Sequence, residues 1–353
     1  MRRAVIIDVV RSPFGRARAN GALAGLHPVD LYAQVLQALV ARTGIDPALV
    51  EDVITGCVLQ VGEQSANIGR QAVLAAGLPE TVPAVTLDRK CGSAQQAFDF
   101  AAQGVIAGAY DVVVAGGVEM MSVVTMKENR MGRDNEGPGL RARYPQGLVR
   151  QGISAELIAA RWKLSRAAQD ELALASHRRA AAAEDRAITP RAIAPVRVPT
   201  ADGGLRVVEC DEGLRRDTSI EKLEALRPAF EDAKAAARFP QISWSVTAGN
   251  SSQVTDGAAA ALIVEESIAV RLGLAPRAAL TGFAVVGDDP VYMLTGPIAA
   301  TRKLLGRTGL RMQDIDAFEV NEAFASVVLA WIAETGADPE RVNALGGAIA
   351  LGH

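Results

Sequence analysis

The sequence has few aromatic residues, few cysteines and no long apolar segment. Aromatic side chains make up 4% of the 353 residues, so aliphatic side chains and 33 glycines must fill the interior. Cys57, Cys91 and Cys210 show no paired spacing and no histidine cluster nearby, which argues against a disulfide framework and against a metal site. The apolar run at residues 4–10 is much too short for a signal peptide or a membrane span. We therefore expect a soluble, cytoplasmic protein with three free thiols.

The chain also lacks an excess of charge of either sign. It has 37 basic and 40 acidic side chains, a formal net charge of −3. This balance gives no bulk electrostatic reason to bind nucleic acid or an anionic membrane. With 49% hydrophobic residues, the chain is long enough for about two domains or one large pseudo-symmetric one. These proportions favour a globular α/β protein.

An internal repeat organises the chain. Arg42-Thr43-Gly44 recurs as Arg307-Thr308-Gly309, an offset of 265 positions, and the preceding helical pattern and the following apolar segment agree at the same offset. The first copy continues through a strand at residues 83–87, a helix at about 92–108 and a strand at 111–115. The second copy is expected to place strands at 317–320 and 342–345.

The second copy ends in the glycine-rich segment 346–353, before the counterpart of the first copy's last helix and strand. We expect roughly 30–40 residues to be missing, because a parallel sheet without its last crossover exposes apolar faces.

A segment of different composition lies between the copies. It contains a helical stretch with Ser154 and Ser165 as expected N-caps, followed by a hairpin signal at residues 196–208. We interpret residues 121–248 as an inserted loop subdomain. Residues 1–120 plus 249–275 then form the N-terminal half, and residues 276–353 form an incomplete C-terminal half.

Cys91 is the candidate nucleophile. It follows the strand at residues 83–87 and precedes a helix, so the positive end of the helix dipole favours its thiolate; a buried structural cysteine is the alternative. Cys57 lies in or at the end of an apolar strand and is expected to pack in the core. Cys210 lies between acidic residues, which disfavour a thiolate.

Three histidines are available as a base. His27 precedes a proline at a helix start, and His177 is followed by two arginines, which favours a capping role and a solvated position, respectively. His353 ends a loop of small residues in the second copy, nearly where Cys91 lies in the first. Pseudo-twofold symmetry would bring these two strand ends together, where ligands bind in such sheets. Asn321, within residues 321–325, adds an amide at a strand end, with helix capping as the alternative.

Four segments taken together resemble the thiolase family. They are Asp88-Arg89-Lys90-Cys91-Gly92-Ser93, Thr247-Ala248-Gly249-Asn250-Ser251-Ser252 with residues 256–259, Asn321-Glu322-Ala323-Phe324-Ala325, and residues 346–353 ending in Gly352-His353. The resemblance extends over essentially the whole chain. It implies a five-layer α-β-α-β-α sandwich of two pseudo-symmetric halves with an inserted loop subdomain, assembled as a homodimer or homotetramer.

The resemblance also implies an activity and its residues. Thiolases cleave 3-ketoacyl-CoA with CoA or condense two acetyl-CoA molecules, with coenzyme A as substrate and no permanently bound cofactor. Cys91 would carry the acyl group as a thioester, His353 would deprotonate it, and a water held by Asn321 would help His353 to stabilise an oxyanion. The residues implied to contact substrate are Arg215, Ser252 and Phe324; solvation of Arg215 and a turn role for Ser252 are the alternatives.

The chain departs from the family pattern in several places. Family members carry a further Cys-x-Gly motif near the C-terminus, whose cysteine moves the proton on the substrate's α-carbon, and this chain contains no such motif. We therefore expect the 353-residue chain to bind CoA esters poorly and to turn over little substrate. Gln151, Asp88 and Ala94 stand where the family often has Met, Asn and Gly, which leaves the acyl-chain preference open. A non-catalytic acyl-CoA-binding protein is the main alternative. A ketoacyl synthase would typically use two histidines, and a dinucleotide oxidoreductase would need a glycine fingerprint that is absent.

Overall fold

The computed structural model describes residues 2–126 and 128–353. The chain divides into two compact units: Met1–Gly132, Ile188–Glu212 and Val254–Thr281 form the first, and Arg133–Ala187, Gly213–Gln253 and Gly282–His353 form the second. Each unit is described by itself below. The sequence analysis divides the chain by its internal repeat into two halves and a loop subdomain, whereas these units are divided by their contacts in space. The sequence-based division therefore stays a prediction.

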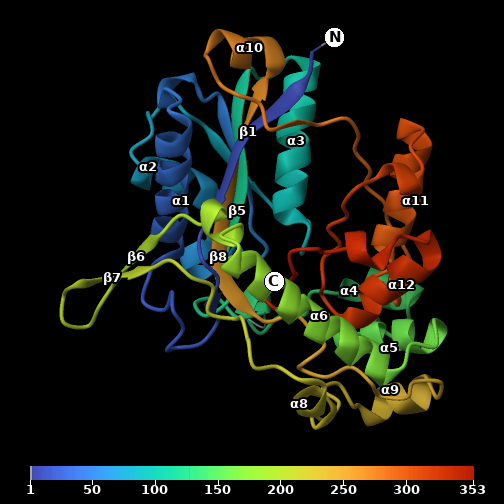
Figure 1. Ribbon diagram of the computed structural model, residues 1–353. Helices are drawn as coiled ribbons and strands as arrows, with labels where there is room; N and C mark the ends of the chain where they lie inside the picture. The colour runs from blue at the N-terminus through green and yellow to red at the C-terminus, as the bar shows by residue number, and fades with distance from the viewer. Residues whose placement is uncertain (1, 127) are drawn as a thin grey trace. The chain divides into compact units, whose positions relative to one another are not determined.

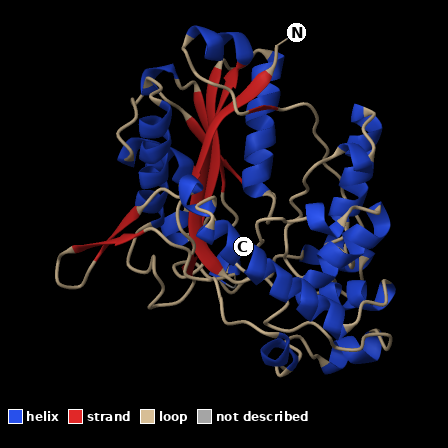
Figure 2. Ribbon diagram, viewed as in Figure 1, coloured by secondary structure: helices blue, strands red, loops and turns tan. Residues whose placement is uncertain are grey.

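The first unit contains a mixed seven-stranded sheet in the order β4-β3-β5-β8-β1-β9, with β2 paired to β8. Its strands are drawn in red in Figure 2. Parallel pairing joins β3 to β4 and to β5, whereas β5, β8, β1 and β9 pair antiparallel. The strands are β1 (Ala4–Arg11), β2 (Gly15–Arg16), β3 (Asp52–Gly56), β4 (Ala84–Leu87), β5 (Val112–Met120), β8 (Thr255–Glu265) and β9 (Ala278–Ala279).

Helices cover both faces of this sheet. In Figure 1, α1 (Pro28–Thr43) and α2 (Ile68–Ala75) lie on one side of the strands and α3 (Ser93–Ala107) lies on the other. The apolar face of α1 packs against β8 and β1, with Tyr32, Leu36 and Leu39 buried in the core. The unit also contains α7 (Thr189–Ala192), α10 (Glu266–Arg271) and the 3-10 turns Pro47–Leu49, Gly62–Gln64 and Glu128–Arg130. This helix-sheet-helix layering holds the start of α3 at the end of β4.

The predicted hairpin is confirmed. Strands β6 (Val196–Pro199) and β7 (Leu205–Val208) pair antiparallel, with Val196 opposite Val208 and Pro199 opposite Leu205. Gly203 in the connecting turn has a φ of 82°, the left-handed conformation that favours glycine.

The second unit is helical. Its helices are α4 (Gly137–Arg143), α5 (Gln151–Arg161), α6 (Arg166–Asp185), α8 (Ile220–Glu224), α9 (Ala233–Arg238), α11 (Gly296–Thr308) and α12 (Ala325–Thr335), and Pro339–Arg341 forms a 3-10 turn. The apolar helix α12 packs against α5, α6 and α11. Ser165 caps α6 as expected, but the prediction for Ser154 is wrong, because that residue is fully buried inside α5.

The two expected strands of the second copy are reduced to one parallel bridge. Phe318 N donates to Arg341 O at 2.8 Å, and Asn343 N donates to Phe318 O at 2.8 Å. No strand runs over residues 317–320 or 342–345. A strand needs a neighbour along its length, and here the pairing stops after one residue on each side.

The repeat is nevertheless visible in the local structure. Helices α1 and α11 end at Thr43 and Thr308, and the next residues, Gly44 and Gly309, both have positive φ, 66° and 72°. The hydroxyl of each threonine donates to a carbonyl four residues earlier, at 2.8 and 2.9 Å. A 3-10 turn follows at the same offset, Pro47–Leu49 in one copy and Met312–Asp314 in the other.

Candidate active site

Cys91 lies in the first unit, in a tight turn between β4 and α3. Its side chain is exposed, and it lies two residues before the first residue of α3. Lys90 has a φ of 49°, so the chain turns sharply just before the cysteine. The residue therefore adjoins the first N–H groups and the positive end of a 15-residue helix. A helix start of this kind generally favours a negative charge close to it.

Hydrogen bonds within the turn hold this geometry. The Ser93 hydroxyl accepts from Arg89 N at 2.8 Å and donates to Lys90 O at 2.6 Å. Asp88 accepts from Lys90 N at 2.7 Å. A side chain could not replace Gly56 on β3, because a Cβ there would lie 2.4 Å from Ala94 N in the first turn of α3. The start of α3 is therefore pressed against the sheet.

The other two cysteines have different surroundings. Cys57 is buried directly after β3, as expected, and its burial, together with the nearby Glu119 carboxylate, raises the pKa of its thiol. Cys210 is exposed. Cys91 is thus the exposed cysteine that also lies at a helix start.

His353 and Asn321 lie side by side in the second unit. Asn321 Nδ2 is 3.5 Å from His353 Nδ1, at the limit of a hydrogen bond. Burial lowers the pKa of His353, which favours the neutral imidazole that a base needs. Asn321 is exposed and lies four residues before α12, and Phe324 takes the N-cap position. The structure therefore does not support the capping alternative for Asn321.

Glu322 holds the loop that leads to His353, and sequence reasoning missed this role. Its buried carboxylate accepts from the Ser176 hydroxyl at 2.6 Å, from Asn343 Nδ2 at 3.0 Å and from Ile349 N at 3.1 Å. Gly347 must lack a side chain, because a Cβ there would lie 2.3 Å from Glu322 Cδ. The pairing of a carboxylate after Asn321 with two consecutive glycines is the signal that could have pointed to this contact.

Ser252 and Phe324 belong to two segments that pair with each other. Ser252 N donates to Ala323 O at 3.0 Å, and Ala325 N donates to Asn250 O at 2.9 Å. Phe324 is buried and meets the edge of Phe230, with ring centroids 5.7 Å apart. Ser252 is half-buried. The two motifs, about seventy residues apart in the sequence, are thus joined by one antiparallel bridge.

Arg215 is exposed, and a buried histidine holds its backbone. Arg215 N donates to His177 Nδ1 at 3.2 Å. His177 is 3% exposed, so the expectation of a solvated position is wrong. Burial, and then the Arg215 charge, lower its pKa to about 4. The helix turn explains the error: one residue turns the side chain by about 100°, so Arg178 faces solvent while His177 faces inward. His27 does cap α1, accepting from Val29 N at 3.2 Å.

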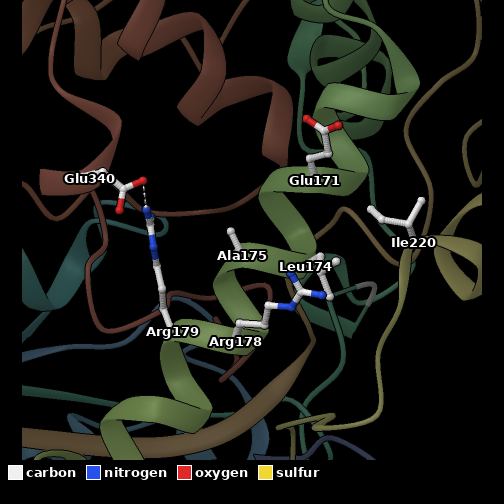
Figure 3. Close-up of a pocket in the computed structure, with 7 residues that line it drawn as sticks. All are labelled: Glu171, Leu174, Ala175, Arg178, Arg179, Ile220 and Glu340. Carbon is white, nitrogen blue, oxygen red and sulfur yellow. Dashed lines mark hydrogen bonds and ion pairs between the residues drawn. The ribbon is translucent and has the colours of Figure 1, made fainter.

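A shallow depression of about 460 Å³ lies on the outer side of α6. Figure 3 shows its lining, in which the ion pair between Arg179 and Glu340, at 3.2 Å, borders one side. The other lining residues are Glu171, Leu174, Ala175, Arg178 and Ile220. None of the candidate site residues lines it.

Two features of the described part of the chain bear on cofactor and membrane binding. Within residues 2–126 and 128–353, no group of three or more His, Cys, Asp or Glu side chains is placed to hold a metal ion. In the same part of the chain, no helix has the length and apolar character required to span a bilayer.

Comparison with known proteins identifies the family. Residues 4–267 match the family model for the thiolase N-terminal domain, and residues 274–353 match that for the thiolase C-terminal domain. The chain is 45% identical to Steroid 3-ketoacyl-CoA thiolase FadA6 of Mycobacterium tuberculosis, covering 100% of this chain and 84% of that protein. It is 41% identical to 3-ketoacyl-CoA thiolase of Salmonella typhimurium, covering 100% and 89%.

A solved structure confirms the predicted thiolase-like α/β fold. The crystal structure of the Bacillus anthracis acetyl-CoA acetyltransferase superposes with a TM-score of 0.88 at 37% identity, covering 100% of this chain and 88% of that one. Both family domains, these relatives and this fold agree, and the chain belongs to the thiolase family.

Proposed function

We propose that this chain is a thiolase-type acyl-CoA acyltransferase that works through an acyl thioester on Cys91. It would cleave 3-ketoacyl-CoA with CoA, or condense two acetyl-CoA molecules in reverse. The observation that carries the proposal is the exposed Cys91 thiol in a rigid turn at the start of α3. The comparisons support an enzyme over a non-catalytic acyl-CoA-binding protein, because the similar proteins are named as thiolases and acetyltransferases.

The proposed thiolysis has two steps. The Cys91 thiol gives its proton to a base, its thiolate attacks the C3 carbonyl of 3-ketoacyl-CoA, and the C2–C3 bond breaks. The acetyl-CoA enolate leaves and takes up the proton that the base holds. The thiolate of free CoA then attacks the Cys91 thioester, which releases the shortened acyl-CoA and restores Cys91. Coenzyme A enters as a substrate, and no permanently bound cofactor is part of the proposal.

His353 is the proposed base in both steps. To take a proton at Nε2, its neutral ring must carry the other proton on Nδ1. The Asn321 amide faces Nδ1 at 3.5 Å and can present its oxygen as the acceptor for that proton. The protonated ring would then stabilise an oxyanion, together with a water held by Asn321, while Cys91 N would serve the other oxyanion.

Three residues of the second unit are proposed to contact substrate. The exposed Arg215 would meet the phosphates of CoA, and the half-buried Ser252 would meet its pantetheine arm. Phe324, fixed by its edge contact with Phe230, would give an apolar wall. The backbone bonds between residues 250–252 and 323–325 support a fixed relation between Ser252 and Phe324.

A homodimer or homotetramer and a cytoplasmic location complete the proposal. Strand β4 is an edge strand of the sheet, and its residue Val85 is 45% exposed. An exposed edge strand favours pairing with a second copy of the chain. Cys91 and Cys210 are exposed, and exposed thiols suit a reducing compartment.

Transfer of an acetyl group to Cys91 tests this function. The protein is incubated with acetyl-CoA and digested, and mass spectrometry should locate an acetyl group on the peptide that contains Cys91. Cys91→Ala is the matched control and should remove the label. An acetyl group on Cys57 or Cys210 would contradict the assignment. Thiolysis of acetoacetyl-CoA by the same preparation then separates an enzyme from an acyl-CoA-binding protein.

A further inference from the structure

Gln253 connects two segments that the proposed function assigns to catalysis and to CoA binding. Its Nε2 lies 2.9 Å from Gly213 O, 3.1 Å from Ile349 O and 2.9 Å from Ala350 O. Carbonyl oxygens only accept hydrogen bonds, so the side-chain nitrogen must face all three. One amide group therefore joins the segment before Arg215 to the turn before His353.

The backbone of Gln253 adds two bonds to the same turn. Gln253 N donates to Ala348 O at 3.3 Å, and His353 N donates to Gln253 O at 3.1 Å. Gln253 thus holds the segment 348–353 at both ends and in the middle. The main chain that carries the imidazole of His353 is fixed directly by this residue.

The segment before Arg215 is packed closely against Gln253 and the His353 turn. A Cβ on Gly213 would lie 3.0 Å from Gln253 Nε2 and 3.0 Å from Leu351 O, so the three segments are packed without spare room. Two residues later, Arg215 N is held by His177. The segment 213–215 therefore has two attachments, one to α6 and one to the His353 turn through Gln253.

We propose that Gln253 is a positioning residue that fixes the His353 turn and the Arg215 segment to each other. This inference rests on the proposed function, because it takes His353 as the base and Arg215 as a CoA contact. A residue that only stabilises the fold would lower stability without changing the kinetics of the folded enzyme. A residue that joins these two segments should alter acylation and CoA affinity together.

Two substitutions and one control test the proposal. Gln253→Met keeps the length of the side chain and removes its donors. We expect Cys91 acetylation to slow about 10²-fold, as for a misplaced catalytic group. The KM for CoA in thiolysis should rise about threefold to tenfold, the effect of weakening one contact. Gln34→Met is the control, since Gln34 is also half-buried and its amide also joins two segments, α1 and β6, in the first unit. Gln34→Met should leave the rate of Cys91 acetylation and the KM for CoA within twofold of the wild-type values.

Gln253→Glu supplies a pH readout. An ionised carboxylate would face three carbonyl oxygens and repel them, whereas a protonated one can donate to one of them. The ratio of its acetylation rate to that of the wild type should therefore rise as the pH falls from 8 to 5.5. A flat ratio, or wild-type acetylation and KM in Gln253→Met, would overturn the proposal. If Gln253→Met does not fold, the Gln253→Glu ratio decides.

The outcome separates this inference from the proposed function. A wild-type protein that acetylates Cys91, with a Gln253→Met variant that does so equally well, refutes the role of Gln253 alone. A wild-type protein that does not acetylate Cys91 refutes the proposed function. Hydrogen exchange then tests the connection itself: amides in both 213–215 and 348–353 should exchange faster in Gln253→Met, and unchanged exchange in either segment refutes it.

Discussion

The Cys91 turn and the His353 turn are built in opposite ways. The Cys91 turn is held by its own sequence, through Asp88, Ser93 and the positive φ of Lys90. The His353 turn is held from a distance, by Glu322 and Gln253. The first turn can form as soon as its six residues and the helix after them are in place. The second requires that the surrounding helices have already packed.

This difference predicts how each turn responds to damage. A change near Cys91 should have a local effect, limited to the start of α3. A change at a residue that supports the His353 turn should cost stability and catalysis together, because the same hydrogen bonds serve both. The predictions below test this contrast, beginning with the largest expected effect.

Removal of the Glu322 carboxylate should have the largest effect. Glu322→Ala leaves three donors, on Ser176, Asn343 and Ile349, without their acceptor in a buried place. We expect the free energy of unfolding to fall by about 3 kcal/mol or more, since charge-assisted bonds are lost and buried groups stay unpaired. Denaturant unfolding measures this loss, and acetylation of Cys91 should slow in the variant that remains folded.

Glu322→Gln sharpens the same test. The amide keeps one oxygen for Ser176 and Ile349 but turns its NH₂ group toward the NH₂ group of Asn343. Asn343 cannot reverse its own amide freely, because its oxygen accepts from Val320 N at 2.8 Å. The loss should therefore be smaller than in Glu322→Ala, about 1–2 kcal/mol. Equal stability of both variants and the wild type would show that Glu322 does not support the turn.

The stability of the second unit, which contains the His353 turn, should also depend on pH through His177. The pKa of His177 is lowered from 6.5 to about 4 by burial and by Arg215, against a smaller opposite effect of Asp217. Between these values the unfolded chain binds more protons than the folded one, so stability falls as the pH drops from 6.5 toward 4. A difference of this size corresponds to about 3 kcal/mol once fully developed. His177→Asn keeps an acceptor for Arg215 N and does not titrate, so its unfolding curve should lose this part of the slope.

The Cys91 turn should lose less when its central hydroxyl is removed. Ser93→Ala eliminates the bonds to Arg89 N and Lys90 O. We expect a loss of about 1–2 kcal/mol and slower acetylation of Cys91, because the turn no longer holds the thiol at the helix start. Ser165→Ala is the matched control: it removes the N-cap bond of α6 to Ala168 N and should cost about 1 kcal/mol. Unchanged acetylation in Ser93→Ala would show that the turn keeps its form without the hydroxyl.

The same contrast explains what the sequence could predict. The start of α3 at Cys91, the hairpin of β6 and β7, and the cap at Ser165 depend on neighbours within a few residues, and all three are found. The strand at 317–320 was wrong in extent, because a ladder depends on a partner that the local pattern does not supply.

The hydrogen bonds that hold the His353 turn could not be predicted from the local sequence. Glu322 and Ile349 are 27 positions apart, and Gln253 and Ala350 are 97 positions apart. A polar residue that is buried and satisfied by distant partners has the same local sequence as an exposed one. His177 shows this clearly, since Arg178 beside it is exposed while its own ring is buried.

The smallest predicted effect compares the two copies of the repeat. Gly44 and Gly309 end α1 and α11 with φ values of 66° and 72°, and a Cβ added at either would meet nothing within 4 Å. Any cost of Gly→Ala therefore comes from the left-handed backbone alone, about 1 kcal/mol.

The surroundings of the two helices should separate these costs. Most of the apolar face of α1 is buried, whereas Ile298 is the buried residue of α11. The last turn of α11 is therefore loosely packed and can unwind to relieve the strain. Gly309→Ala should lower the free energy of unfolding less than Gly44→Ala does. Gly306→Ala, inside α11 with open space around it, should stabilise by a few tenths of a kcal/mol through helix propensity. Denaturant unfolding of the three variants measures the order. An equal loss of stability in Gly44→Ala and Gly309→Ala would contradict this expectation. It would show that the packing of a helix does not change the cost of a substitution at its C-cap.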